Sequence, residues 1–256
     1  MSEPVRYELV NGVATITMDN PEARNRLTVD GMRLLQRHLE TAAADETVRV
    51  VVLTGSGNTF CAGADLANAT AGGGFADGLQ ALATLLTTML DHPKPIISRV
   101  QGHVAGGGNG LIAASDISIA VEEAKFAFSE VRVGAAPAVI SVVCLMRMNR
   151  IDASELLLTG ERVSAERVVK AGLVTRAVET DALDATVRSY VDSFVQCGPI
   201  ALANTKKLIR NVPYMGIDEA FTWTTELSAG LFSSPEAQEG MSAFLAKRPA
   251  AWVPQT

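Results

Sequence analysis

The sequence predicts an α/β protein in which strands and helices alternate early and helices dominate later. Apolar, β-branched runs at residues 48–54 and 96–100 have the length and composition of buried strands. Capping signals and helical periodicity prevail after residue 139. We therefore expect a strand-and-helix core in residues 1–195 and a helical region in residues 196–256.

The N-terminal elements carry clear local signals. Residues 7–10 and 13–18 flank Asn11-Gly12, a pair that favours a tight hairpin because both turn residues take positive φ. Thr28 is suited to cap a helix that extends to residue 44. We expect a loop over residues 68–78 and then a helix over residues 79–90.

The later elements are mostly helical. Asp181 is expected to cap one helix, and Ser234, followed by Pro235, is expected to cap the last one. A further strand is expected at residues 116–121. The predicted helices cover residues 139–148, 153–158, 165–171, 181–195, 200–210, 217–232 and 235–246.

Composition limits the classes of function. The 256 residues carry a net charge of −6, which argues against broad nucleic-acid binding. The three cysteines have no metal-like spacing and suit free thiols in a reducing compartment. The N-terminus lacks the basic start and apolar core of a signal peptide, and no run reaches the about 18 apolar residues of a membrane span. We expect a cytoplasmic protein without a metal, a nucleic-acid partner or a membrane.

Two glycine-containing loops follow predicted strands. Gly106-Gly107-Gly108 lies between the strand at residues 96–100 and a small apolar helix, and Gly63 follows the strand at residues 48–54. Glycine lets a ligand approach the backbone, and a helix N-terminus has free N–H groups. Two such loops could place two N–H donors around one carbonyl oxygen, which is an oxyanion hole.

Seven short motifs follow one another along nearly the whole chain. They are Phe60-Cys61-Ala62-Gly63-Ala64-Asp65-Leu66, Gln101-Gly102-His103-Val104-Ala105-Gly106-Gly107-Gly108, Ser115-Asp116-Ile117, Phe126-Ala127-Phe128-Ser129-Glu130, Leu158-Thr159-Gly160, Ala171-Gly172-Leu173-Val174 and Glu239-Gly240-Met241-Ser242-Ala243-Phe244. In this order they resemble the motifs of the crotonase (enoyl-CoA hydratase/isomerase) superfamily. The resemblance implies a spiral of ββα units and a C-terminal helical region, residues 196–256, that serves trimerisation and covers the site. It also implies a homotrimer or a hexamer built from two trimers.

The resemblance also implies roles for individual residues. The amides of Ala64 and Gly107 would bind the thioester oxygen of an acyl-CoA, and Glu130 would be the acid/base. Coenzyme A would be part of the substrate, so no separate cofactor is implied. Residues that would line the substrate or coenzyme A site are Ala62, Asp65, Leu66, Gly106, Gly110 and Lys247.

One position departs from the family pattern. Hydratases with two catalytic glutamates carry the second one where this chain has Gly110. A single glutamate resembles enoyl-CoA isomerases, and it also occurs in hydratases of branched or dicarboxylic substrates. Residues 129–141 resemble methylglutaconyl-type hydratases, whereas Ala138 stands where dienoyl-CoA isomerases have an aspartate. We expect an open space beside Gly110 that receives the acyl tail.

Three functions therefore remain open. An enoyl-CoA hydratase is the main interpretation, and the alternatives are an enoyl-CoA isomerase and a non-catalytic acyl-CoA-binding protein. His103 has no nearby nucleophile to activate, so a structural role is expected. Cys61 is expected to be a small buried side chain rather than a reactive thiolate.

Overall fold

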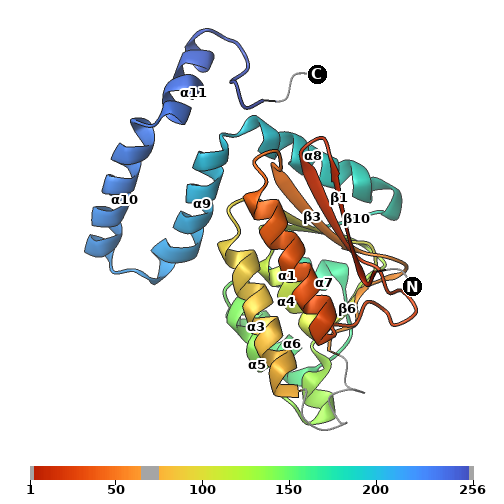
Figure 1. Cartoon of the computed structure of the whole chain (residues 1–256). Helices are drawn as coiled ribbons and strands as arrows, with labels where there is room; N and C mark the ends of the chain where they lie inside the picture. The colour runs from red at the N-terminus through yellow and green to blue at the C-terminus, as the bar shows by residue number, and fades with distance from the viewer. Residues whose placement is uncertain (1–2, 65–74, 254–256) are drawn as a thin grey trace.

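The computed structural model describes residues 3–64 and 75–253, except for the side chain of Phe75. The chain forms two sheets surrounded by helices (Figure 1). In the larger sheet only the first pair of strands is antiparallel. Its strands, in spatial order, are β1 (Val5–Val10), β2 (Val13–Met18), β3 (Val50–Gly55), β5 (Ile96–Val100), β7 (Ile117–Val121) and β10 (Arg176–Val178).

The smaller sheet lies beside the first and contains short strands. Its first three strands are parallel and its last strand is antiparallel to its neighbour. Its order is β4 (Thr59–Cys61), β6 (His103–Ala105), β8 (Lys125–Ala127) and β9 (Val163–Ser164). Three times in succession the chain adds one strand to the large sheet, one to the small sheet, and then a helix. This repetition is the spiral of ββα units that the family resemblance implies.

The helices cover the sheets and extend beyond them. Helix α8 contacts β3, β5 and β7, whereas α1, α3, α4 and α5 pack on one another in succession. The α-helices are α1 (Val29–Ala44), α3 (Phe75–Asp91), α4 (Gly107–Ala114), α5 (Ala138–Cys144), α6 (Arg150–Thr159), α7 (Ala165–Lys170), α8 (Leu183–Gln196), α9 (Pro199–Asn211), α10 (Ile217–Phe232) and α11 (Pro235–Leu245). The 3-10 helices are η1 (Ser129–Val133), η2 (Thr180–Ala182) and η3 (Val212–Tyr214).

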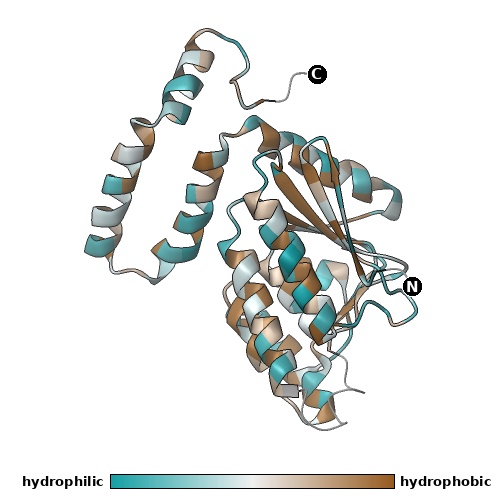
Figure 2. Ribbon diagram, viewed as in Figure 1, coloured by the Kyte–Doolittle hydropathy of each residue, from teal (hydrophilic) through white to brown (hydrophobic). Residues whose placement is uncertain are grey.

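The core forms where the large sheet is covered by helices on both faces. Every residue of β3 is buried, so its continuous apolar run is typical of a central parallel strand. Figure 2 shows most of this strand as hydrophobic, in brown. Helices α10 and α11 lie away from this core, beyond α9 (Figure 1). The expected division near residue 195 stays a prediction.

Several local predictions are confirmed. Asn11 and Gly12 have φ values of 50° and 77°, as a type I′ hairpin turn requires. The Thr28 hydroxyl accepts a hydrogen bond from Gly31 N at 3.0 Å and caps α1. Ser234 caps α11 in the same way.

Other boundaries were predicted wrongly. Residues 75–78, expected in a loop, form the first turn of α3 despite Gly78. The rest of that expected loop, residues 68–74, lies outside the described residues. Asp181 does not cap α8, because it lies within η2 and Ala182 is the cap residue. The helix expected over residues 139–148 ends at Cys144, and the next begins at Arg150 after the Asn149 cap.

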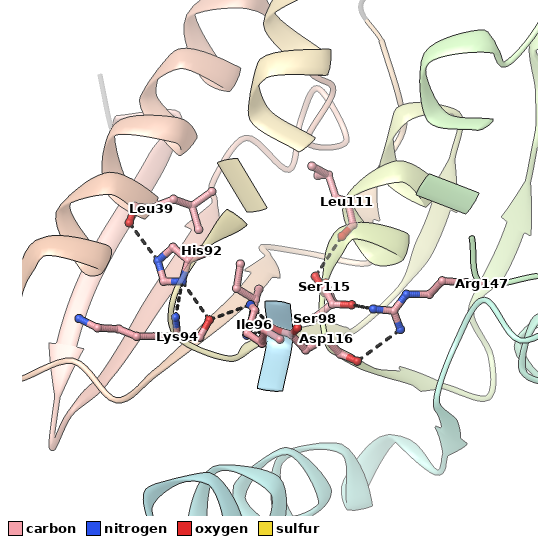
Figure 3. A network of polar contacts seen from close by, with 10 residues as sticks. Leu39, His92, Lys94, Ile96, Ser98, Leu111, Ser115, Asp116 and Arg147 are labelled. Carbon is pink, nitrogen blue, oxygen red and sulfur yellow. Dashed lines mark hydrogen bonds and ion pairs between the residues drawn. The ribbon is translucent and has the colours of Figure 1, made fainter. Parts of the chain in front are cut away.

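A buried polar network joins α9 to the sheet core. Asp116 Oδ2 accepts hydrogen bonds from Ile96 N at 2.7 Å and from Lys206 Nζ at 2.6 Å. Lys206 Nζ also donates to Lys94 O at 3.0 Å, and the side chain is only 10% exposed. Burial lowers the pKa of Lys206, whereas Asp116 raises it. Figure 3 shows Asp116 within this network, between Ile96 and Arg147.

The network makes a prediction about stability. Asp116→Asn leaves the Lys206 ammonium buried without a counter-charge, so the free energy of unfolding should fall by about 3 kcal/mol. The control is Asp192→Asn, which breaks the exposed Arg188–Asp192 pair. It should change the free energy of unfolding by less than about 0.5 kcal/mol. Urea denaturation measures both variants. Equal losses of unfolding free energy in the two variants would contradict the structural role of Asp116.

Candidate active site

The candidate site lies where three parallel strands of the small sheet end. Residues 62–64 follow β4, residues 106–107 follow β6, and residues 128–130 follow β8. Because β4, β6 and β8 are parallel neighbours, their carboxyl ends meet at one edge. The topology therefore brings together the two glycine loops and Glu130, which are distant in the sequence.

Two glycines allow these segments to touch. A Cβ on Gly63 would lie 2.9 Å from Ala105 O, and φ at this residue is +86°. Gly106 has φ 49° and ψ −123°, a conformation that glycine adopts readily and other residues do not. A Cβ on Gly106 would lie 3.3 Å from Glu130 Oε1 and 3.6 Å from Gly63 Cα. Gly106 is thus in close contact with both the first loop and the carboxylate.

The backbone offers two amide donors at this place that have no acceptor in the described parts of the chain. Leu27 N donates to Gly63 O at 2.8 Å, and Leu27 forms a parallel bridge with Ala64. Gly107 is the first residue of α4, so its amide has no acceptor within the helix. Within residues 3–64 and 75–253, neither the Ala64 nor the Gly107 amide donates to the backbone of another loop or turn. The positive end of the α4 dipole adds to the attraction for a negative oxygen.

Glu130 is the acidic side chain beside these loops. It is the second residue of η1, which begins directly after the buried Phe128, and it is half-buried. Its Oε2 atom is buried and has no hydrogen-bond partner among the described residues. Burial raises the pKa of Glu130 above its usual range. A carboxyl group with a raised pKa and an oxygen left open to a ligand is suited to take up and return a proton.

The space expected beside Gly110 is filled. A Cβ on Gly110 would lie 2.7 Å from Ile140 Cγ2 and 3.4 Å from Leu86 Cδ1. The expectation of an open cavity for the acyl tail at this position is therefore wrong, because Ile140 of α5 packs there. Sequence reasoning missed this role of Ile140, since the two residues are far apart in the chain and no local pattern pairs them.

The remaining predicted residues are placed as follows. Ala62 is half-buried at the first loop, where its amide donates to Arg24 O at 3.0 Å. Asp65 and Leu66 lie outside the described residues. Lys247 is exposed and follows α11, which Figure 1 places away from α4. The structure does not bring Lys247 to Glu130 within one chain.

Neither His103 nor Cys61 behaves as a catalytic nucleophile or base. His103 Nδ1 accepts a hydrogen bond from Lys125 N at 3.1 Å, and the side chain is exposed. Cys61 is fully buried, which raises its pKa to about 12. No group of His, Cys, Asp or Glu in the described parts of the chain could hold a metal ion. No helix in the same parts is long and apolar enough to cross a membrane.

Comparison with known families agrees with this geometry. The model of the enoyl-CoA hydratase/isomerase family matches residues 8–255. The chain belongs to this family. It is 33% identical over 239 residues to enoyl-CoA hydratase EchA19 of Mycobacterium tuberculosis, covering 91% of this chain and 90% of that protein. It is 31% identical over 253 residues to (E)-benzylidenesuccinyl-CoA hydratase of Thauera aromatica, covering 96% of this chain and 97% of that protein.

Solved structures support the same assignment of fold. An enoyl-CoA hydratase of Mycobacterium smegmatis matches with a TM-score of 0.93 and 32% identity, covering 98% of this chain and 99% of that one. This member of the enoyl-CoA hydratase/isomerase family therefore has the crotonase fold. Its two sheets are mostly parallel and are surrounded by helices.

The raised pKa of Glu130 makes a prediction about stability. The folded protein holds this proton more tightly than the unfolded chain does. The contribution of Glu130 to stability is therefore full below the unfolded-state pKa and is lost as pH rises through the raised folded-state pKa. Glutamine does not ionise, so Glu130→Gln avoids this loss of stability at high pH. The variant should therefore be more stable than the wild type at about pH 8 but not at about pH 4.

Urea denaturation at several pH values between these limits measures the difference. Glu161→Gln is the control, because Glu161 is 67% exposed and its nearest cation, Arg132, is 3.9 Å away. The Glu161→Gln control should change the free energy of unfolding little at any pH. A stability difference for Glu130→Gln that does not depend on pH would contradict the burial of an ionisable carboxyl group.

Proposed function

We propose that this protein is an enoyl-CoA hydratase that adds water across the 2,3 double bond of an enoyl-CoA thioester. The observation that carries the proposal is the buried Oε2 of Glu130, which has no hydrogen-bond partner among the described residues. Glu130 lies beside Gly106, at the edge where the Ala64 and Gly107 amides donate to no loop or turn that the structure describes. This arrangement offers a base and an oxyanion hole next to each other. Its family relatives named as hydratases support the same reaction class.

The proposed mechanism uses one carboxylate twice. The thioester oxygen accepts hydrogen bonds from Ala64 N and Gly107 N, each worth about 3 kcal/mol in comparable sites. Glu130 takes a proton from water as the water oxygen bonds to C3, and the double-bond electrons move to give a thioester enolate. The protonated Glu130 then returns this proton to C2. One water is consumed, and the carboxylate is regenerated.

Ile140 favours a second candidate function. Because its side chain fills the space next to Gly110, no second carboxylate can stand there without displacing it. An isomerase needs only one acid/base to move a proton between C2 and C4, so Glu130 alone would suffice. A non-catalytic acyl-CoA-binding protein would use the same oxyanion loops. The reaction of enoyl-CoA thioesters in H₂¹⁸O distinguishes the three. A hydratase puts the heavy oxygen into the product, an isomerase moves the double bond without taking up oxygen, and a binding protein does neither.

Replacement of the carboxylate tests the role of Glu130. Glu130→Gln should lower turnover of crotonyl-CoA at least about 100-fold and leave acyl-CoA affinity nearly intact, since it removes the acid/base but not the oxyanion hole. Glu161→Gln should retain wild-type turnover. Steady-state hydration rates and equilibrium titration with butyryl-CoA measure the two quantities. Turnover of Glu130→Gln near the wild-type value would move the chemistry to another residue.

A pair of substitutions tests the packing at Gly110. Gly110→Glu should lower the free energy of unfolding by about 2 kcal/mol, because the new side chain overlaps Ile140. Adding Ile140→Ala should recover much of this loss and allow a second carboxylate to stand in the site. The double variant should then hydrate crotonyl-CoA faster than Gly110→Glu does. The single and double variants should differ in unfolding temperature and in hydration rate. Identical values would contradict the inference that Ile140 fills the space beside Gly110.

The proposal includes assembly into a homotrimer or a pair of trimers. Phe221 and Phe232 of α10 and Phe244 of α11 are 70%, 66% and 83% exposed in the single chain. Such aromatic surface supports burial against other copies of this chain. Light scattering should give a molar mass at least three times the 27.0 kDa of one chain. Phe221→Asp should reduce this molar mass. A wild-type monomer at micromolar concentration would contradict this part of the proposal.

The proposal also includes a cytoplasmic location. Cys61 and Cys144 are free and buried, and Cys197 is free and exposed. Free thiols at all three cysteines support a reducing compartment.

A further inference from the structure

Asn109 is a fully buried polar residue in the first turn of α4. Its Nδ2 donates to Ala127 O at 2.9 Å and to Gly106 O at 3.3 Å. Both partners are carbonyl oxygens, which only the NH₂ end of the amide can serve. The Oδ1 atom is buried and has no hydrogen-bond partner in the described chain.

The bond to Gly106 O acts on the peptide that carries the oxyanion donor. The carbonyl of Gly106 and the N–H of Gly107 belong to the same planar peptide unit. Gly106 O accepts from Asn109 Nδ2 and also from Asn109 N at 2.9 Å. Two donors on the carbonyl fix the orientation of the peptide plane. They also draw electron density toward the oxygen, which makes the Gly107 N–H a stronger donor.

The bond to Ala127 O links this peptide to the strand that leads to Glu130. Ala127 is the last residue of β8, and Glu130 follows three residues later in η1. Ala127 O accepts from Gly106 N at 3.1 Å as well as from Asn109 Nδ2. One side chain therefore sets the position of the N-terminus of α4 relative to the segment that carries the carboxylate.

Asn109 has the one polar side chain in α4. Other residues of α4 are glycine, alanine, leucine and isoleucine, and all of them are buried. A buried amide oxygen without a partner lowers stability, so the amide brings a cost that an apolar residue would avoid. Both hydrogen bonds of its NH₂ group lead to the candidate site. Function at that site accounts for the amide better than packing does.

We propose that Asn109 is a positioning residue, whose amide orients the Gly106–Gly107 peptide and strengthens the Gly107 N–H as a donor to the thioester oxygen. The inference rests on the proposed function, because it requires an acyl-CoA thioester in the site. Asn109 itself does not touch the reacting atoms. It acts through the peptide that does.

Two variants of opposite volume test the role of the amide. Asn109→Ala leaves a void and Asn109→Leu fills it, and both lack the NH₂ group. The control is Ser115→Ala, which removes a buried donor to Leu111 O at the other end of α4. The probe is butyryl-CoA labelled with ¹³C at the thioester carbon, which binds without reacting. Isotope-edited infrared spectroscopy reports how strongly the bound carbonyl is polarised.

In the wild type and in Ser115→Ala, the carbonyl stretch of the bound probe should fall below its value in water. In both Asn109 variants it should move back toward that value. The kcat for crotonyl-CoA hydration should fall about tenfold with little change in KM, as expected for a modest loss in transition-state stabilisation. Thermal unfolding of each variant is measured alongside.

The other outcomes separate the two proposals. A carbonyl stretch in both Asn109 variants equal to that of the wild type would overturn the positioning role and leave the hydratase proposal intact. Loss of the folded state in both variants, with Ser115→Ala folded, would make Asn109 purely structural and also overturn it. Failure of wild-type protein to bind butyryl-CoA would overturn the proposed function, and this inference with it.

Discussion

Three parallel strands of the small sheet end at one edge, and the segments that follow them can meet only if backbone approaches backbone. Gly63 and Gly106 make this possible, because a Cβ on either would press on a neighbouring carbonyl or carboxylate. Both also adopt positive φ, which makes a replacement strained as well as crowded. The free amides of Ala64 and Gly107 and the position of Glu130 all follow from this close approach.

Two buried polar atoms at this edge lower stability. Oε2 of Glu130 and Oδ1 of Asn109 have no hydrogen-bond partner among the described residues. In contrast, the charges of Lys206 and the half-buried Asp116, beyond the opposite end of α4, are satisfied by each other and by backbone groups. Unsatisfied polar groups can mark places where function opposes stability. Glu130 and Asn109 differ in this respect from Lys206 and Asp116, whose bonds hold α9 to the sheet core.

The sequence predicted well the parts of the fold that depend on local chemistry. The Asn11-Gly12 turn, the Thr28 and Ser234 caps and the strand expected at residues 48–54, observed as β3, each follow from neighbouring residues. The short strands β4, β6 and β8 were not predicted, because three residues carry too little periodicity and are held by pairing across the chain. The same long-range pairing brings Glu130 to the glycine loops, a proximity expected from family resemblance alone.

Two features of the site were beyond sequence reasoning. The packing of Ile140 on Gly110 joins α5 to α4, so the empty position looked like a cavity when only the sequence was considered. The role of Asn109 depends on which carbonyl oxygens its NH₂ group reaches, and one of them belongs to β8. Neither contact has a local signature, since each depends on how distant elements pack.

The most direct test of the account is the structure of the protein with bound butyryl-CoA. The thioester oxygen should lie about 3 Å from both Ala64 N and Gly107 N, with the Glu130 carboxylate facing C2 and C3 of the acyl chain. A thioester oxygen bound away from these amides would contradict the central claim. The cavity of about 360 Å³ between α9 and the core, lined by Arg147, Lys206 and Tyr214, is one such place.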